Sequence, residues 1–167
     1  MRRIGRSRAA HLVLVPSQAP APGRICQFCS YCGAAQERPE ANQASRVCND
    51  CGFGVILEAA SELAPRPGDA FIVLDSSLSV CAVSRTAERL LETLETCAVN
   101  RHISELVVPA DAEAQGSASL AIAVSHAARG DDAPRRMTVR PTNTFGIRLS
   151  ARIGACGPAN AALVVFD

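Results

Sequence analysis

Two copies of the pattern Cys-x-x-Cys-Gly constrain this chain more than any other feature of its sequence. They occupy residues 29–33 (Cys-Ser-Tyr-Cys-Gly) and 48–52 (Cys-Asn-Asp-Cys-Gly). Each pattern offers two thiolates from one tight turn, and its glycine permits the left-handed backbone that points amide groups at the sulfurs. Two such turns facing each other form a closed tetrahedral site with four sulfur ligands. The sequence therefore predicts a structural metal site with the ligands Cys29, Cys32, Cys48 and Cys51.

The spacing of the cysteines favours this metal site over a framework of disulfide bonds. Of the eight cysteines, five lie between residues 26 and 51, and the other three are isolated. Cys26 is a fifth thiol beside the site; we interpret it as a spare surface cysteine, with a ligand-swapping redox switch as the alternative. Cys81 and Cys156 fall in extended patterns and are expected to be small, buried or half-buried residues.

The charge is small overall but unevenly distributed along the chain. The formal net charge is +1, and all 17 basic residues are arginines. Residues 1–25 carry five arginines and no acid, whereas residues 26–68 carry three arginines and five acids. A divalent ion held by four thiolates makes the metal module still more negative. Such a module is poorly suited to a phosphate backbone, so nucleic-acid binding is not favoured.

Changes of composition divide the chain into four parts. Residues 1–24 contain several prolines and only a short apolar stretch, and we expect a disordered leader rather than a secretion signal. Residues 25–57 form the metal module. Residues 58–68 form a linker that starts with a helical pattern (58–63) and ends in a helix-breaking Pro-Arg-Pro-Gly. Residues 69–167 form a second domain. No apolar run is long enough to span a membrane. Because the thiolate metal site indicates a reducing compartment, we expect a cytoplasmic protein.

The second domain mixes short strands and helices. Extended patterns predict strands at residues 71–74, 78–83, 136–140, 145–156 and 161–166. Helical patterns predict helices at residues 85–92, 103–108 and 117–129. Ser84 is expected to cap the first of these helices, and Gly130 is expected to end the third.

The order of these elements and three segments of the sequence resemble the PAS domain family. Residues 69–75 (Asp-Ala-Phe-Ile-Val-Leu-Asp) look like the family's opening apolar strand, and residues 80–91 look like its second strand followed by a helix of the type Ala-x-x-x-Ala-Glu-x-Leu-Leu. Residues 101–111 resemble its Gly-Arg-x-x-x-Asp-Leu-x-x-Pro-x-Asp segment. The resemblance covers residues 69–167. Residues 29–52 are similar to rubredoxin-like zinc ribbons, and the pairing looks like uncharacterised bacterial signalling-type proteins.

The resemblance implies an α+β protein, in which a small zinc ribbon with four cysteine ligands precedes a PAS-like five-stranded antiparallel sheet with helices on one face. The implied strand order is 2-1-5-4-3. A site with four sulfur ligands accepts zinc or iron. We favour one Zn²⁺ per chain, because the loop between the two cysteine patterns is short and lacks the aromatic core of electron-transfer rubredoxins.

PAS domains sense small ligands, bind cofactors or mediate dimers, and the fold does not choose among these roles. Some relatives ligate haem through a histidine in the third helix, but His126 points away from that helix's apolar face and is expected to be exposed. Photosensing relatives use an Asn-Cys-Arg-Phe segment, and the matching residues 100–103 contain no cysteine. With aromatic residues at 4%, haem and flavin are not favoured and the PAS ligand stays unknown. His102 is expected to cap a helix or to face solvent.

The sequence contains no catalytic constellation outside the metal cysteines. We therefore expect a non-catalytic regulatory protein that acts as a sensor or through a protein partner of unknown identity, with homodimerisation through the PAS-like domain as one option. Three alternatives stay open: a thiol-based redox sensor that releases zinc on oxidation, a nucleic-acid-binding transcriptional regulator, and an electron carrier with iron.

Overall fold

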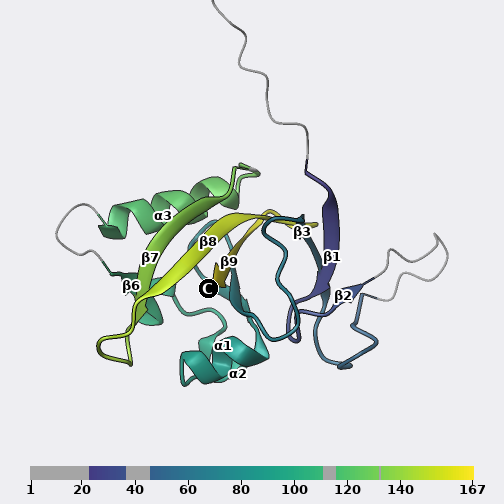
Figure 1. Cartoon of the computed structure of the whole chain (residues 1–167), viewed down its shortest axis with the longest axis horizontal. Coiled ribbons are helices and arrows are strands. Elements are labelled where there is room, and N and C mark those ends of the chain that lie inside the picture. The colour runs from purple at the N-terminus through teal and green to yellow at the C-terminus, as the bar shows by residue number, and fades with distance from the viewer. Residues whose placement is uncertain (1–22, 37–45, 111–115, 132) are drawn as a thin grey trace, which may run out of the picture.

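The computed structural model describes residues 23–36, 46–110, 116–131 and 133–167, and it packs a small antiparallel sheet against a large one (Figure 1). The leader expected over residues 1–24 lies almost wholly outside the described residues. The described part contains no helix that is long and apolar enough to cross a membrane.

The small sheet belongs to the part of the chain that carries the metal cysteines. Its strands have the order β2-β1-β3 and are β1 (Ile25–Cys29), β2 (Ala35–Gln36) and β3 (Ile56–Ala60). The helical pattern predicted for residues 58–63 is wrong, because β3 continues to Ala60 and pairs with β1 along its whole length. On its other edge, β3 pairs with Gly157. The amide of Gly157 donates to the carbonyl of Glu58, and its carbonyl accepts from the amide of Glu58. We call residues 23–36 and 46–60 the cysteine module.

The large sheet is antiparallel and has six strands in the order β5-β4-β9-β8-β7-β6. The strands are β4 (Ala70–Leu74), β5 (Val80–Val83), β6 (Val107–Pro109), β7 (Arg135–Pro141), β8 (Leu149–Cys156) and β9 (Ala161–Phe166). Without β6, this order is the 2-1-5-4-3 arrangement that the PAS resemblance implies.

The predicted number of five strands is wrong, and the reason lies in the segment that we expected to form a helix at residues 103–108. Only a short 3-10 turn, η1 (Ile103–Glu105), forms there. The chain then extends as β6 and pairs with the end of β7, with Val107 opposite Pro141 and Pro109 opposite Val139. Pro109 suits this position, because an edge strand tolerates a residue that has no amide hydrogen to donate.

In the described part of the chain, helices cover one face of the large sheet, as expected, although the sequence did not predict the second of them. They are α1 (Arg85–Leu90), α2 (Glu95–Ala98) and α3 (Gly116–Ala127). Ser84 caps α1 as predicted, since its hydroxyl accepts a hydrogen bond from the amide of Ala87. Helix residues such as Ala87 and Val124 pack on sheet residues such as Ile72 and Val164 in one buried cluster.

The cysteine module covers the opposite face of the large sheet. Phe28, Ala59 and Leu63 share a second buried cluster with Phe71 and with other residues of β4 and β9. The rings of Phe28 and Phe71 meet edge to face, with centroids 5.7 Å apart and planes at 85°. Because successive side chains of a strand point to opposite faces, β4 is buried at all five positions. The cysteine module therefore packs on β4, the first strand of the large sheet in chain order.

We predict that Phe28→Ala lowers the free energy of unfolding by about 3–5 kcal/mol, since it empties the centre of the contact between the two sheets. Urea denaturation followed by far-UV circular dichroism measures the loss. The matched control is Phe145→Ala, because Phe145 is 100% exposed, and it should change stability by less than about 0.5 kcal/mol. A loss below about 1 kcal/mol for Phe28→Ala would contradict the packing described above.

Candidate metal centre

The two Cys-x-x-Cys-Gly patterns fold into two equivalent turns, which we call the first knuckle (residues 29–33) and the second knuckle (residues 48–52). In each knuckle the glycine amide donates to the carbonyl of the first cysteine over 3.0 Å. Both glycines have the left-handed backbone that the sequence predicts, with φ of 73° for Gly33 and 70° for Gly52. A side chain at either glycine would be strained in this conformation.

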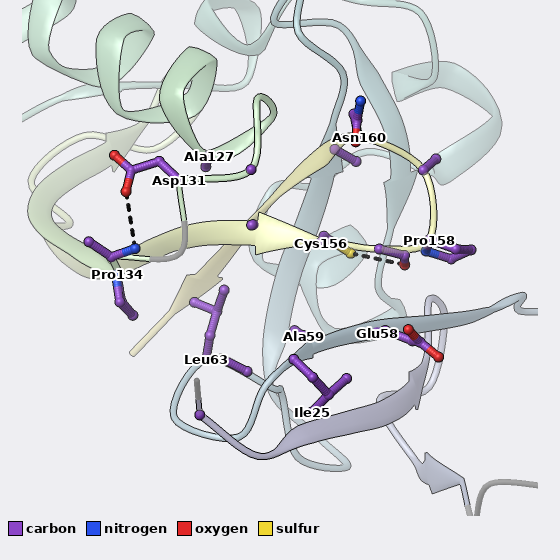
Figure 2. Close-up of a pocket in the computed structure, with 18 of the residues that line it drawn as sticks. Ile25, Glu58, Ala59, Leu63, Ala127, Asp131, Pro134, Cys156, Pro158 and Asn160 are labelled. Carbon is purple, nitrogen blue, oxygen red and sulfur yellow. Dashed lines mark hydrogen bonds between the residues drawn. The ribbon is translucent and has the colours of Figure 1, made fainter. Parts of the chain in front are cut away.

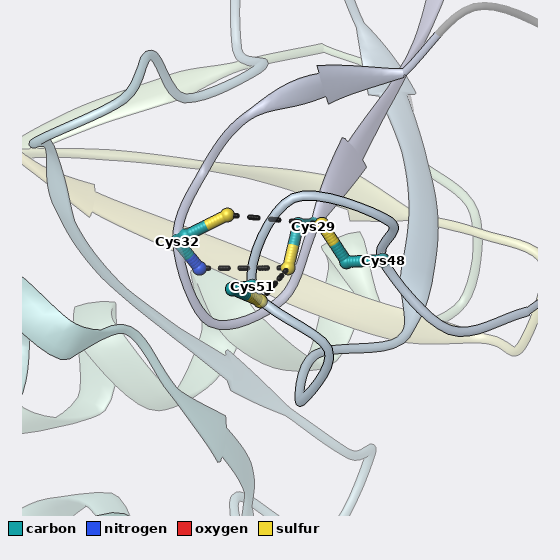
Figure 3. Close-up of side chains that lie close together, drawn as sticks. All are labelled: Cys29, Cys32, Cys48 and Cys51. Atoms are coloured by element: carbon teal, nitrogen blue, oxygen red, sulfur yellow. Dashed lines mark hydrogen bonds between the residues drawn. The ribbon is translucent and has the colours of Figure 1, made fainter.

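The structure brings the four predicted ligands together (Figure 3). All four sulfur atoms lie within 4.8 Å of one another. The Sγ atoms of Cys29 and Cys51 are 3.6 Å apart, and those of Cys32 and Cys48 are 3.9 Å apart. A tetrahedron with metal–sulfur bonds of about 2.3 Å has edges of about 3.8 Å, so this spacing fits an ion held by four thiolates. The group can therefore hold a metal ion.

Hydrogen bonds from the surrounding residues point at the sulfur atoms. The amides of Tyr31 and Cys32 donate to Cys29 Sγ over 3.4 and 3.5 Å. The side-chain amide of Gln36 lies 3.8 Å from Cys48 Sγ and donates to Asp50 over 3.0 Å. Donors of this kind stabilise the thiolate form of a cysteine and fix its direction, which is the usual task of groups around a metal site.

Burial and hydrogen bonding together give the cysteine thiols different pKa values. It raises the pKa of Cys29 to about 12, against the opposing effect of the amides of Cys32 and Tyr31. Burial also acts to raise the pKa of Cys51, but the amides of Gly54 and Phe53 and the neighbouring thiols together bring it down to about 7. Cys29 is fully buried, so its charged form needs compensation by a cation in the centre.

Gly54 is a residue of the site that sequence reasoning missed. It helps to hold the second knuckle, since its carbonyl accepts from the amide of Cys48 over 2.8 Å. A Cβ atom at this position would collide with Cys29 Sγ and would lie 2.8 Å from the Tyr31 amide nitrogen. The need for glycine arises from the approach of the two knuckles in space, so the spacing of the cysteines does not reveal it.

The other cysteines lie outside the group of four. Cys26 is half-buried on β1, opposite Ala59 of β3. Cys156 is buried as expected, and its burial raises the pKa of its thiol to about 12. The expectation for Cys81 is wrong: its side chain is exposed, because the pairing of β4 with β5 shifts by one residue at this point.

Neither histidine singled out from the sequence approaches the metal centre. His126 is exposed, as expected, and its Nδ1 lies 3.1 Å from the guanidinium of Arg135, which also donates to Asp131. His102 was expected to cap a helix or to face solvent. It caps η1, since its ring nitrogen accepts a hydrogen bond from the amide of Ser104.

A groove of about 700 Å³ lies where the cysteine module meets the large sheet (Figure 2). Ile25 and Leu63 line it from one side, and the end of α3 and the turn between β8 and β9 line it from the other. The groove is therefore not the space between helices and sheet in which a PAS-like domain would hold an apolar ligand. Its acidic lining residues are Glu58, Glu62 and Asp131.

No protein-family model matches the chain, and no curated protein matches it. The chain is similar to solved structures of sensory domains. They include a domain of a sensory box sensor histidine kinase/response regulator from Geobacter sulfurreducens (11% identity, TM-score 0.44, 59% of this chain and 82% of that one). The PAS domain of the nitrogen regulation protein NR(II) from Vibrio parahaemolyticus is another (15%, TM-score 0.44, 60% and 88%). At this similarity, these structures say nothing of what this chain binds.

We predict that Gly54→Ala weakens metal binding by at least roughly tenfold, because the new methyl group pushes Cys29 Sγ and the first knuckle away from the other ligands. Titration of the metal-free protein with Co²⁺, followed by the thiolate-to-cobalt absorption, measures the affinity. The control is Gly157→Ala, whose nearest atom beyond the chain neighbours would be 3.7 Å away. Equal affinities for the two variants would show that the close approach at Gly54 has no role in the site.

Proposed function

We propose that the chain is a non-catalytic, cytoplasmic regulatory protein in which one structural Zn²⁺ holds a zinc ribbon against a PAS-like sensor or interaction domain. A closed set of four thiolates supports a structural ion, because it leaves no coordination position for a substrate. Zinc is favoured over iron because the loop between the two cysteine patterns is short and because zinc needs no redox partner.

One observation carries this proposal: the residues next to the metal ligands are those that join the cysteine module to the large sheet. Phe28 precedes Cys29 and packs on Phe71 of β4. Tyr31 lies inside the first knuckle, and its carbonyl accepts from the amide of Arg85 at the start of α1. A metal ion that fixes the knuckle thus fixes how the module covers the sheet. A module this small has too little core of its own and depends on such a cross-link.

We propose that the PAS-like domain recognises a protein partner, or a second copy of the chain, rather than a flat cofactor. The space between helices and sheet is filled by apolar side chains, among which Val124, Val139 and Ile153 are at most 1% exposed. Such packing supports a role through the surface of the domain. The alternative of a redox sensor gains some support from Cys32 and Cys51, which are only partly buried and are open to an oxidant.

Native mass spectrometry of the freshly purified protein tests this proposal, because it reads the metal, any retained ligand and the oligomeric state together. We expect a mass increase of one zinc ion per chain. Cys48→Ser should lose the ion, and Cys81→Ser should keep it, since Cys81 is exposed and lies outside the group of four. A protein without metal, or one with iron, would contradict the proposal, and an additional bound small molecule would favour a ligand sensor.

A further inference from the structure

Tyr31 connects the candidate metal centre directly to helix α1. Its amide donates to Cys29 Sγ over 3.4 Å, and its carbonyl accepts from the amide of Arg85 over 2.9 Å. Both groups belong to one residue of the tight turn that the metal ligands define. A change in the shape of that turn therefore moves the Tyr31 carbonyl, which accepts the hydrogen bond from the first residue of α1.

The bond from Arg85 matters because α1 is short. It spans Arg85–Leu90, and an isolated helix of this length is not stable in water. The first amides of a helix have no partner inside it. The hydroxyl of Ser84 accepts from Ala87, and Tyr31 takes the amide of Arg85. The start of α1 thus depends on a contact that the first knuckle provides.

A carboxylate extends this connection to α2. The hydroxyl of Tyr31 donates to Glu88 over 3.4 Å, and the other oxygen of Glu88 accepts from the amide of Glu95 over 2.7 Å. Glu95 in turn accepts from the amide of Val83, at the end of β5, over 3.0 Å. We call residues 84–99, which contain both helices, the α1–α2 unit.

A second set of contacts connects the metal centre to α1, and it starts at the residue before the ligand Cys29. Phe28, the residue before Cys29, packs edge to face on Phe71. The hydroxyl of Ser84 accepts from the amide of Phe71 over 2.9 Å, and the amide of Ser84 donates to the Phe71 carbonyl over 2.9 Å. Phe28 before this cysteine and Tyr31 after it therefore both reach the start of α1.

We infer that the metal state of the four-cysteine centre controls the stability of the α1–α2 unit, with Tyr31 as the positioning residue between them. This inference rests on the proposed function in one respect, namely that the four cysteines bind a metal ion. With the ion bound, the first knuckle is fixed and its carbonyl holds the start of α1. Without the ion, the knuckle loses the cross-link between its two cysteines and the second knuckle, and the α1–α2 unit opens more often than α3.

Arg85 offers a variant that removes this one hydrogen bond and leaves the helix intact. Proline is well tolerated at the first position of a helix, where it lacks only the amide hydrogen. The preceding residue must be extended, and Ser84 already is, with φ −68° and ψ 152°. Arg85→Pro therefore deletes the donor to Tyr31, and its ring Cδ, which replaces the amide hydrogen, also moves the Tyr31 carbonyl away. Arg85→Ala is the matched control, because it removes the same side chain and keeps the amide.

The test is amide hydrogen exchange of the full chain, with native mass spectrometry first establishing the metal content of each sample. In the metal-loaded protein, Arg85→Pro should speed exchange in residues 86–99 by roughly three- to tenfold, as expected for the loss of one hydrogen bond, and Arg85→Ala should not. Removing the metal by chelation should speed exchange in residues 86–99 more than in residues 120–127 of α3.

Two results would overturn the inference. One is that Arg85→Pro and Arg85→Ala exchange alike in residues 86–99. The other is that metal removal speeds exchange equally in residues 86–99 and 120–127, as a general loss of stability would. A chain that binds no metal would instead contradict the proposed function, and the mass measurement identifies that failure separately.

Discussion

The burial of Phe28 against Phe71 is the contact on which the rest of the structure depends. It lies at the centre of the apolar cluster between the cysteine module and the large sheet. Without the module, one side of β4 and β9 would expose Phe71, Val73 and Leu163 to water. The helices cover only one face of the large sheet. Because its central strands are apolar on both faces, the other face needs a cover too, and the cysteine module provides it.

The dependence runs in the other direction as well. The cysteine module has two strands of five residues and one of two, and a sheet of this size is at best marginally stable by itself. Its knuckles are held by four thiols, and its core is completed by side chains of the large sheet. The metal centre and the sheet contact thus stabilise the same module from its two sides, and the residues flanking Cys29 take part in both.

Features that depend on neighbouring residues could be predicted from the sequence, and features that depend on distant ones could not. The gathering of four cysteines, the left-handed glycines after them and the Ser84 cap follow from local patterns, and the structure has them. The sixth strand, the true course of residues 58–60 and the requirement for glycine at position 54 did not follow. β6 forms because β7 offers an open edge, β3 continues to Ala60 because β1 pairs with it that far, and Gly54 is needed because a sulfur atom from the first knuckle lies against it.

The central claim is that the metal centre and the large sheet form one cooperative unit. Urea unfolding of the Co²⁺-loaded protein tests it most directly, with the thiolate-to-cobalt absorption reporting the centre and far-UV circular dichroism reporting the sheet. We expect both signals to change at the same urea concentration, as they do when a single transition connects two states. Loss of the cobalt absorption at a lower urea concentration, with the circular dichroism still native, would contradict it.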